Sequence, residues 1–402
     1  MPSISIYAEL IPQSAIRMLT PFADKAEADG ITVYHLNIGA PDIKSPESAP
    51  KAVREFQFDH LPYSNSAGTL SLRKALVEKY YAKLGIDITP DEIIVTNGGS
   101  EGVHFALMTV CDKDDEVLVM EPFYCNYSTF AALGHLKFVT VPTDIRDGFK
   151  LPKAEEFEKR ITPRTKALLI CNPSNPTGTL YTKKEMLALG ELCRKHDLFL
   201  ISDEVYREFC YTDAPHFSAM HIPGLEQHVI LLDSASKRYN LCGARIGCII
   251  SRNHEVMDFV TRLAQARLCP PVLGQVATYG ALEADESYFA AVRREYKARR
   301  DFTIAALNNI PGVYTPTPMG AFYTLAELPV PDAQAFCKWM LTDFHPDGET
   351  VMLTPAAAFY KTPGAGMNQV RVAYVLEIPR LQRAMKVLEA GLEEYRKINN
   401  LL

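Results

Sequence analysis

Residues 229–250 read VILLDSASKRYNLCGARIGCII, and this stretch holds two apolar runs separated by a short polar loop. The runs Val229–Asp233 and Ile246–Ile250 are rich in branched aliphatic residues, which predicts two buried strands. Lys237 lies in the loop among small and polar residues, and Arg245 follows it eight positions later, directly before the second run. In α/β sheets ligands bind where strands end. A lone lysine is usually a solvated surface residue, so the interpretation of Lys237 depends on its neighbours in the fold.

Apolar runs alternate with amphipathic segments along the middle of the chain. Helical patterns occupy Ser100–Val110 and Lys183–Lys195, between runs typical of strands that are covered on both faces. The alternation predicts an α/β domain over residues 45–285, a mostly parallel seven-stranded sheet flanked by helices. The five further predicted strands are Ile93–Thr96, Glu116–Met120, Lys137–Val141, Lys166–Cys171 and Leu198–Ser202. Four side chains spaced four apart are predicted to form one buried helix face: Leu72, Leu76, Tyr80 and Leu84.

The sequence changes character after the charged helical run around residues 293–300. Short, proline-punctuated strands follow, and the chain ends in a predicted helix over Ile378–Asn399. We therefore predict a smaller α+β domain over residues 286–402. The N-terminal segment, residues 1–44, holds too little to fold alone and is expected to pack with this smaller domain.

The composition is that of an ordinary folded chain and excludes several classes of function. The 402 residues include 42 Lys and Arg against 48 Asp and Glu, a net charge of −6, and 47% of them are hydrophobic. With a pI near 6.0 and no basic tail, the chain lacks the electrostatic footprint of a nucleic-acid-binding protein. No run of 18 apolar residues could span a membrane, and the first residues show no signal-peptide pattern.

The cysteines and histidines indicate a cytoplasmic protein without a metal site. The nine cysteines are scattered, odd in number and never spaced as CxxC, which is typical of reduced thiols in the cytoplasm. The ten histidines form no HxxxH or HExxH pair, so the sequence predicts no metal ligands.

Three polar motifs follow predicted strands and are expected at the same sheet edge as Lys237. Asn97–Gly102 opens a helix, and its glycines let backbone N–H groups approach an anion at the helix N-terminus. Asn172–Gly178 is a proline-rich turn that can fix an amide side chain. Ser202–Tyr206 places carboxylates at the end of an apolar strand, where each needs a partner. Each motif alone has a structural explanation, but together they predict one polar, anion-binding cleft.

Four motifs occur in order along the chain: NPSNPTG, SDEVY, SASKRYNLCGARIG and a late VR in an apolar strand. In this pattern the chain resembles the class I/II aminotransferases of the pyridoxal-phosphate (PLP) fold type I superfamily, from about Asn37 to Arg371. The resemblance implies PLP as cofactor and a homodimer with shared active sites. It also implies that an amino group moves between an amino acid and a 2-oxo acid by a PLP/PMP ping-pong mechanism. Aspartate and 2-oxoglutarate are the expected pair.

The resemblance assigns catalytic roles to residues of these motifs. Lys237 is expected to bind PLP covalently and to move the substrate proton, since a desolvated lysine amine condenses with aldehydes. Asp203 is expected to pair with the pyridine nitrogen, which makes the ring an electron sink. Tyr206 is expected to hydrogen-bond the ring oxygen, and Tyr124 to stack on the ring.

The resemblance also assigns residues to the cofactor phosphate and to the substrate carboxylate. The phosphate ligands are expected to be Gly99, Ser100 and Glu101 through their backbone, Ser234, Arg245, and Tyr63 reaching from the neighbouring subunit. Arg371 is expected to hold the substrate α-carboxylate through two parallel hydrogen bonds. Gly39 and Asn175 would complete the carboxylate pocket.

The chain departs from the family pattern where the substrate side chain is read. Some aspartate aminotransferases carry a lysine at the position of Ser100, and others use an arginine from the partner subunit. Here the expected substitute is Arg267, before a Cys-Pro-Pro turn, with an interface salt bridge as the structural alternative. Arg17, in the N-terminal QSAIRML segment, is a second candidate. The sequence alone does not explain Glu101, beside the phosphate turn.

Other activities of the same fold keep Lys237, Asp203 and Arg371. These are a PLP-dependent C–S β-lyase, an aminocyclopropane-carboxylate-synthase-like enzyme and a ligand sensor that has lost catalysis. In the resembled family, the bonds matching Glu121-Pro122 and Asn175-Pro176 are commonly cis, and we expect both to be cis here.

Overall fold

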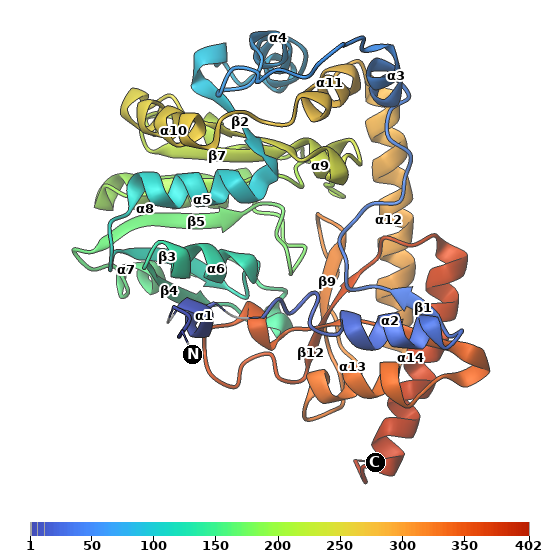
Figure 1. The fold of residues 1–402 in the computed structure, drawn as a ribbon. Helices are drawn as coiled ribbons and strands as arrows, with labels where there is room; N and C mark the ends of the chain where they lie inside the picture. Colours follow the sequence, from blue (N-terminus) through green and yellow to red (C-terminus); the bar gives the residue numbers. More distant parts are fainter. Residues whose placement is uncertain (1, 6, 12, 402) are drawn as a thin grey trace.

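The computed structural model describes residues 2–5, 7–11 and 13–401, and a seven-stranded sheet forms its centre (Figure 1). The strand order is β2-β8-β7-β6-β5-β3-β4. Four neighbouring pairs are parallel, whereas β8 runs antiparallel to both β7 and β2. The strands are β2 (Ile93–Asn97), β3 (Glu116–Glu121), β4 (Lys137–Pro142), β5 (Thr165–Cys171), β6 (Phe199–Asp203), β7 (Val229–Ser234) and β8 (Ile246–Ile250). The predicted mostly parallel sheet is thus confirmed, with one reversed strand inside it.

Helices cover both faces of this sheet and give it two apolar cores. One core joins side chains of α5 (Gly98–Val110), α6 (Asn126–Leu133) and α10 (His254–Arg267) to one sheet face. The other core lies on the opposite face. Its helices are α4 (Leu70–Ala75), α7 (Ala154–Glu158), α8 (Lys183–His196) and α11 (Val272–Ala281), with α3 (Ser48–Glu55) packed against α11. The strands are buried between these layers, as their continuous apolar runs predict.

The predicted helix face near residue 75 is only partly confirmed. Leu72, Leu76 and Tyr80 are buried, but Leu84 is exposed. The helix α4 passes into a π-type turn over Leu76–Tyr81 and a 3₁₀ turn over Ala82–Leu84. The wider turn changes the angular spacing of the side chains, so a strict four-residue period fails at its last position.

A second body is built from both ends of the chain around its own apolar core. Strand β1 (Thr32–His35) pairs in parallel with β10 (Glu349–Met352), and β11 (Thr354–Pro355), β12 (Gln369–Ala373) and β9 (Tyr323–Glu327) form an antiparallel sheet. The accompanying helices are α2 (Thr20–Ala28), α12 (Glu286–Asn309), α13 (Ala333–Thr342) and α14 (Ile378–Ile398). The long helix α12 runs from the large sheet into this second body (Figure 1). The exact domain limits stay a prediction.

The N-terminal segment touches both bodies. The short helix α1 (Tyr7–Leu10) contacts α6 beside the large sheet, and α2 contacts α13 and β1 in the second body. Figure 1 shows the blue segment between them crossing from one body to the other. Within the described ranges, no helix combines the length and apolarity needed to cross a membrane.

Candidate functional site

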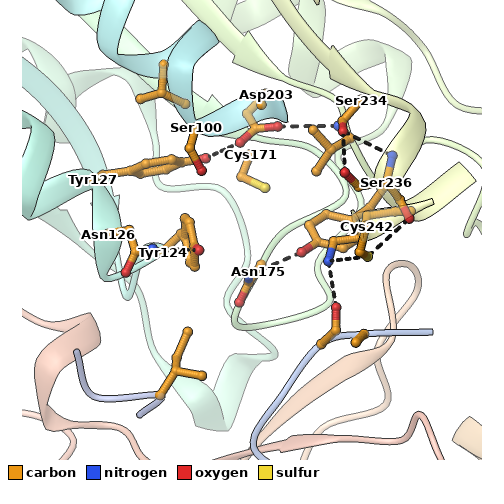
Figure 2. Close-up of a pocket in the computed structure, with 18 of the residues that line it drawn as sticks. Ser100, Tyr124, Asn126, Tyr127, Cys171, Asn175, Asp203, Ser234, Ser236 and Cys242 are labelled. Carbon is orange, nitrogen blue, oxygen red and sulfur yellow. Dashed lines mark hydrogen bonds between the residues drawn. The ribbon is translucent and has the colours of Figure 1, made fainter. Parts of the chain in front are cut away.

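A cavity of about 600 Å³ lies at the carboxyl ends of the parallel strands, between the two bodies (Figure 2). Its volume is typical of a pocket for a cofactor or small molecule. The lining includes most of the predicted site residues: Gly39, Gly99, Ser100, Tyr124, Asn175, Asp203, Tyr206, Ser234, Lys237, Arg245 and Arg371. Motifs that are up to 332 residues apart in the sequence, Gly39 to Arg371, thus meet in one place.

Lys237 is held by the short helix α9 (Ala235–Arg238), which follows β7. Ser234 caps this helix, because its hydroxyl accepts the backbone N–H of Ser236. The Nζ atom of Lys237 donates to the carbonyl oxygen of Gly39 at 2.6 Å and lies 3.7 Å from the sulfur of Cys242. Gly39 leaves no room for a side chain, since a Cβ there would lie 1.6 Å from the Tyr323 hydroxyl. The amine is therefore positioned by backbone rather than by an anion.

Asp203 is the last residue of β6, and the residue is 7% exposed. It accepts the Tyr127 hydroxyl at 2.5 Å and the backbone N–H of Val205 at 3.3 Å (Figure 2). Burial raises the pKa of Asp203 to about 6, and the Tyr127 hydrogen bond opposes that rise. No ion pair within the described part of the chain includes Asp203. The carboxylate is buried and lacks a cation.

The Tyr206 hydroxyl contacts two other polar side chains of the cavity, Tyr323 and Asn175. Its hydroxyl is 3.0 Å from that of Tyr323 and accepts the Asn175 amide at 3.3 Å. All three side chains are buried, at 4% exposure or less. The Tyr206 phenol is thereby fixed in the cavity, facing the same space as Lys237.

Arg371 is the largest fully buried polar side chain, at 1% exposure, on β12. One guanidinium nitrogen donates to the Asn175 side-chain oxygen at 2.9 Å, and another donates to the Asn37 carbonyl at 2.5 Å. Its Nε has no hydrogen-bond partner in the described chain, and no carboxylate pairs with the guanidinium. The ring of Tyr323 lies 4.5 Å below it. A buried arginine without an anion is suited to a ligand carboxylate.

The N-terminus of α5 and Arg245 form an anion-binding corner of the cavity. The first N–H groups of a helix have no partner within the helix. Arg245 bridges to this corner, donating to the carbonyls of Cys242 at 3.0 Å and of Asn97 at 3.2 Å. Gly98 has φ of +73°, and a Cβ there would lie 2.4 Å from the Arg245 guanidinium. Only glycine allows this close approach.

Three predicted residues lie outside the lining of the cavity. Glu101 points away from it: its carboxylate accepts the backbone N–H of Asn97 at 2.8 Å and pairs with Arg267 at 3.4 Å. This pair explains Glu101, which caps the start of its own helix. Arg267 also donates to the carbonyls of Ser66 and Val95, so contacts within its own chain hold it, and its predicted role across a subunit interface stays a prediction. Tyr63 is 77% exposed, away from this cavity, and its predicted contact with a second subunit stays a prediction.

The structure adds residues that the sequence reasoning did not find. Tyr127, Tyr323, Asn126, Ser236 and Cys242 all line the cavity. Ser236 and Cys242 flank Lys237 in the sequence and could have been found by proximity. Tyr127 and Tyr323 have no sequence signal, because their roles come from contacts with strands distant in the chain.

The two expected cis bonds, Glu121-Pro122 and Asn175-Pro176, are confirmed. A third, Asn172-Pro173, was not predicted.

Comparisons with known proteins give a consistent result. The family model for aminotransferase class I and II matches residues 31–388. Aromatic-amino-acid aminotransferase 2 of Thermococcus litoralis is 31% identical, over 98% of this chain and 100% of that protein. Aspartate/prephenate aminotransferase of Thermus thermophilus is 30% identical, over 96% and 98% of the two chains.

Solved structures agree with these sequence matches. The aspartate aminotransferase from Thermus thermophilus with maleate superposes with a TM-score of 0.87 at 29% identity, covering 97% of this chain and 100% of that one. The alanine aminotransferase from Pyrococcus furiosus gives a TM-score of 0.87 at 31% identity, covering 98% and 100%.

Proposed function

Because the chain belongs to the class I and II aminotransferase family, it is a transaminase, and we propose that it moves the amino group of aspartate to 2-oxoglutarate. We propose that it does so with PLP as cofactor, in the cytoplasm, as a homodimer whose subunits share active sites. The curated relatives named above are aminotransferases, which favours transamination over the β-lyase, synthase and sensor alternatives.

Features of this chain fit PLP before any ligand is considered. The buried Asp203 carboxylate lacks a cation, and a pyridinium nitrogen would supply one. The α5 N-terminus with Ser234 and Arg245 offers donors for a phosphate, and the aromatic ring of Tyr124 faces the same cavity. Lys237 lies between them with its amine free of any carboxylate among the described residues. PLP carries groups that complement all of these features: the carboxylate, the cationic anion site, the aromatic ring and the amine.

We assign the cofactor contacts accordingly. Asp203 would hold the ring nitrogen, Tyr206 the ring oxygen, and Tyr124 one face of the ring. Gly99, Ser100 and the Glu101 backbone at the helix start, with Ser234 and Arg245, would hold the phosphate, and Tyr63 would reach it from the second subunit. When bound, PLP accepts the electron pair released at the substrate α carbon.

The observation that carries the proposal is the arrangement of Lys237 and Arg371 around one cavity. Arg371 would bind the α-carboxylate of the amino acid through its guanidinium, with Asn175 and Gly39 beside it. That orientation brings the α carbon toward Lys237, whose amine would take the proton from that carbon and return it elsewhere on the reacting molecule. Arg371 is buried and Lys237 is half-buried, which limits the access of water to the proton transfer.

The choice of aspartate is supported by relatives that are named for it, including those of Thermus thermophilus and Bacillus subtilis. We also propose the domain limits 45–285 and 286–402, with residues 1–44 packed on the smaller domain. Pairing of β1 with β10 supports that packing.

Replacement of the lysine tests the proposal. Lys237→Ala is expected to abolish transamination of aspartate with 2-oxoglutarate while circular dichroism and thermal unfolding stay those of the native fold. After borohydride reduction, mass spectrometry is expected to find PLP on the peptide that contains Lys237 in the wild type and nowhere in the variant. Turnover within tenfold of the wild type, or PLP attached to another lysine, would contradict the assignment.

A further inference from the structure

The cavity contains one cation to which the proposed function has given no task. Its lining includes four: Arg17, Lys237, Arg245 and Arg371. Lys237 contacts Gly39, Arg245 contacts two carbonyls beside α5, and Arg371 contacts Asn175 and Asn37. Arg17 lines the cavity as an exposed residue and has neither a side-chain hydrogen bond nor an ion pair with any described residue. A guanidinium at a ligand cavity without its own anion is available to a ligand.

The backbone at Arg17 is fixed relative to the carboxylate clamp by two hydrogen bonds. Arg371 donates to the carbonyl of Asn37 at 2.5 Å, and the Asn37 amide donates to the carbonyl of Ile16 at 2.9 Å. Asn37 is fully buried, so neither bond competes with bulk water. Because Arg17 directly follows Ile16, its position is set from the same residue that orients Arg371.

Packing supports the same placement. Ile16 is buried in an apolar cluster with Cys125 and Phe359. The Phe359 ring also lies 5.3 Å from the Arg371 guanidinium. Burial raises the pKa of the Cys125 thiol, whereas Arg371 and Arg17 both lower it by their positive charge. Both guanidiniums therefore act on one thiol, that of the residue between the lining residues Tyr124 and Asn126.

Among the described residues, the other groups considered for binding the substrate side chain lack a free positive charge. Ser100 is neutral, and Arg267 is engaged with Glu101 outside the cavity lining. Asn126 donates its amide to the Tyr124 hydroxyl at 2.8 Å, so both side chains are neutral and paired (Figure 2). A second carboxylate entering this space needs a cation, because an unpaired charge is costly to desolvate.

We propose that Arg17 binds the side-chain carboxylate of four- and five-carbon dicarboxylic substrates and so makes the enzyme selective for them. This inference rests on the proposed function, in which Arg371 binds the α-carboxylate. Two guanidiniums held through one buried asparagine would then grip the two ends of the same molecule. The planar fork of arginine suits this task better than a lysine ammonium.

The test compares Arg17→Ala, Arg17→Lys and a control, Arg294→Ala, in the PLP-loaded enzyme. Arg294 is exposed on α12 and outside the cavity lining, so its loss changes the net charge equally without touching the site. The first half-reaction is followed alone, by cofactor absorbance, with aspartate and with alanine as donors. This choice matters because 2-oxoglutarate is itself a dicarboxylate and would mix both effects in steady-state turnover. Binding of maleate is measured by calorimetry, which needs no turnover.

Arg17→Ala is expected to lower kcat/KM for aspartate by about 10- to 100-fold and to weaken maleate binding similarly, the size of a lost charge-assisted pair in a partly open site. For alanine the change is expected to stay within about threefold. Arg17→Lys should show only part of the loss in kcat/KM for aspartate and in maleate binding. Arg294→Ala should match the wild type.

Equal losses on aspartate and alanine, or unchanged maleate affinity in Arg17→Ala, would overturn the inference while leaving transamination intact. If the wild type converts neither donor, the proposed function fails separately, and the maleate measurement still decides the role of Arg17. Thermal unfolding of each variant, with Arg17→Lys as the conservative change, separates loss of binding from loss of folding.

Discussion

Two buried aspartates at the ends of neighbouring strands are treated in opposite ways by this chain. Asp233 on β7 accepts the Tyr81 hydroxyl at 2.7 Å and pairs with Arg238. Burial opposes its ionisation, yet Arg238 and Arg207 hold the pKa of Asp233 below its usual value. Asp203 on β6 is buried to a similar degree without a cation, and its pKa rises to about 6.

The difference separates a structural carboxylate from a functional one. Asp233 belongs to a closed network, since Arg207 in turn pairs with Glu204 at 2.6 Å and every charge has a counter-charge within the chain. Asp203 is left open toward the cavity, and so is Arg371. Buried charges that the fold does not neutralise mark where a ligand completes the structure. Burial alone would not have distinguished the two aspartates.

The sharpest way to break this comparison is Asp203→Ala. Transamination is expected to fall by about 10³-fold or more, because the ring nitrogen would lose its counter-charge. The free energy of unfolding of the cofactor-free protein at pH 7 should not fall. A raised pKa means that the folded state is penalised as pH rises from about 4 to about 6, and the variant removes that penalty. Activity assays and urea unfolding check the two expectations, with Asp203→Asn as the matched neutral variant. A marked loss of stability would show that Asp203 is a structural carboxylate like Asp233.

Asp233→Ala is expected to show the reverse pattern. Removing this carboxylate leaves Arg238 as an uncompensated buried cation, whereas Arg207 keeps its pair with Glu204, so the free energy of unfolding should fall by about 3–5 kcal/mol. Because the pKa of Asp233 is lowered, its stabilisation is present at neutral pH and is lost as pH falls through the folded-state pKa. Urea unfolding of the wild type and variant at pH 7 measures the difference. A loss below 1 kcal/mol would show that the network is not closed.

Arg267→Ala extends the comparison to the Glu101 pair. We expect a loss of about 1–2 kcal/mol in the free energy of unfolding, since the pair is mostly buried and Arg267 also donates to three carbonyls. The first half-reaction should change equally for aspartate and alanine. A loss of rate with aspartate but not with alanine would show that Arg267 is a substrate ligand and not a structural residue.

The smallest effect is expected from Tyr127→Phe. The Tyr127 hydroxyl lowers the pKa of Asp203, so its loss should move that pKa further above 6, by the equivalent of about 1 kcal/mol or less. As pH is lowered, the affinity of the cofactor-free variant for PLP should then begin to weaken at a higher pH than that of the wild type. Tyr81→Phe is the matched control, because it removes a donor from Asp233 instead. Identical pH profiles for the two variants would contradict the role of Tyr127.

The sequence was a good guide to the sheet and a poorer one to the contacts between its elements. Strand limits agree within one residue, because a strand buried on both faces reads as an unbroken apolar run. The lining residues at strand ends were found for the same reason. Tyr127 and Tyr323 were missed, and the pair between Arg267 and Glu101 was not predicted. In each case the decisive partner lies far away in the sequence, so no local pattern records it.

The reversed strand β8 has a consequence for how this site can vary. Consecutive parallel strands need a long crossover, usually a helix, and such a connection absorbs insertions away from the site. Between β7 and β8 the chain instead turns back at the same sheet edge, and Ala235–Arg245 is the entire connection. Lys237 and Arg245 therefore lie on one short connection, both ends of which are anchored in the sheet. A residue added or removed between them would therefore change the distance between the Lys237 amine and the Arg245 guanidinium, because no longer loop is present to absorb the insertion or deletion.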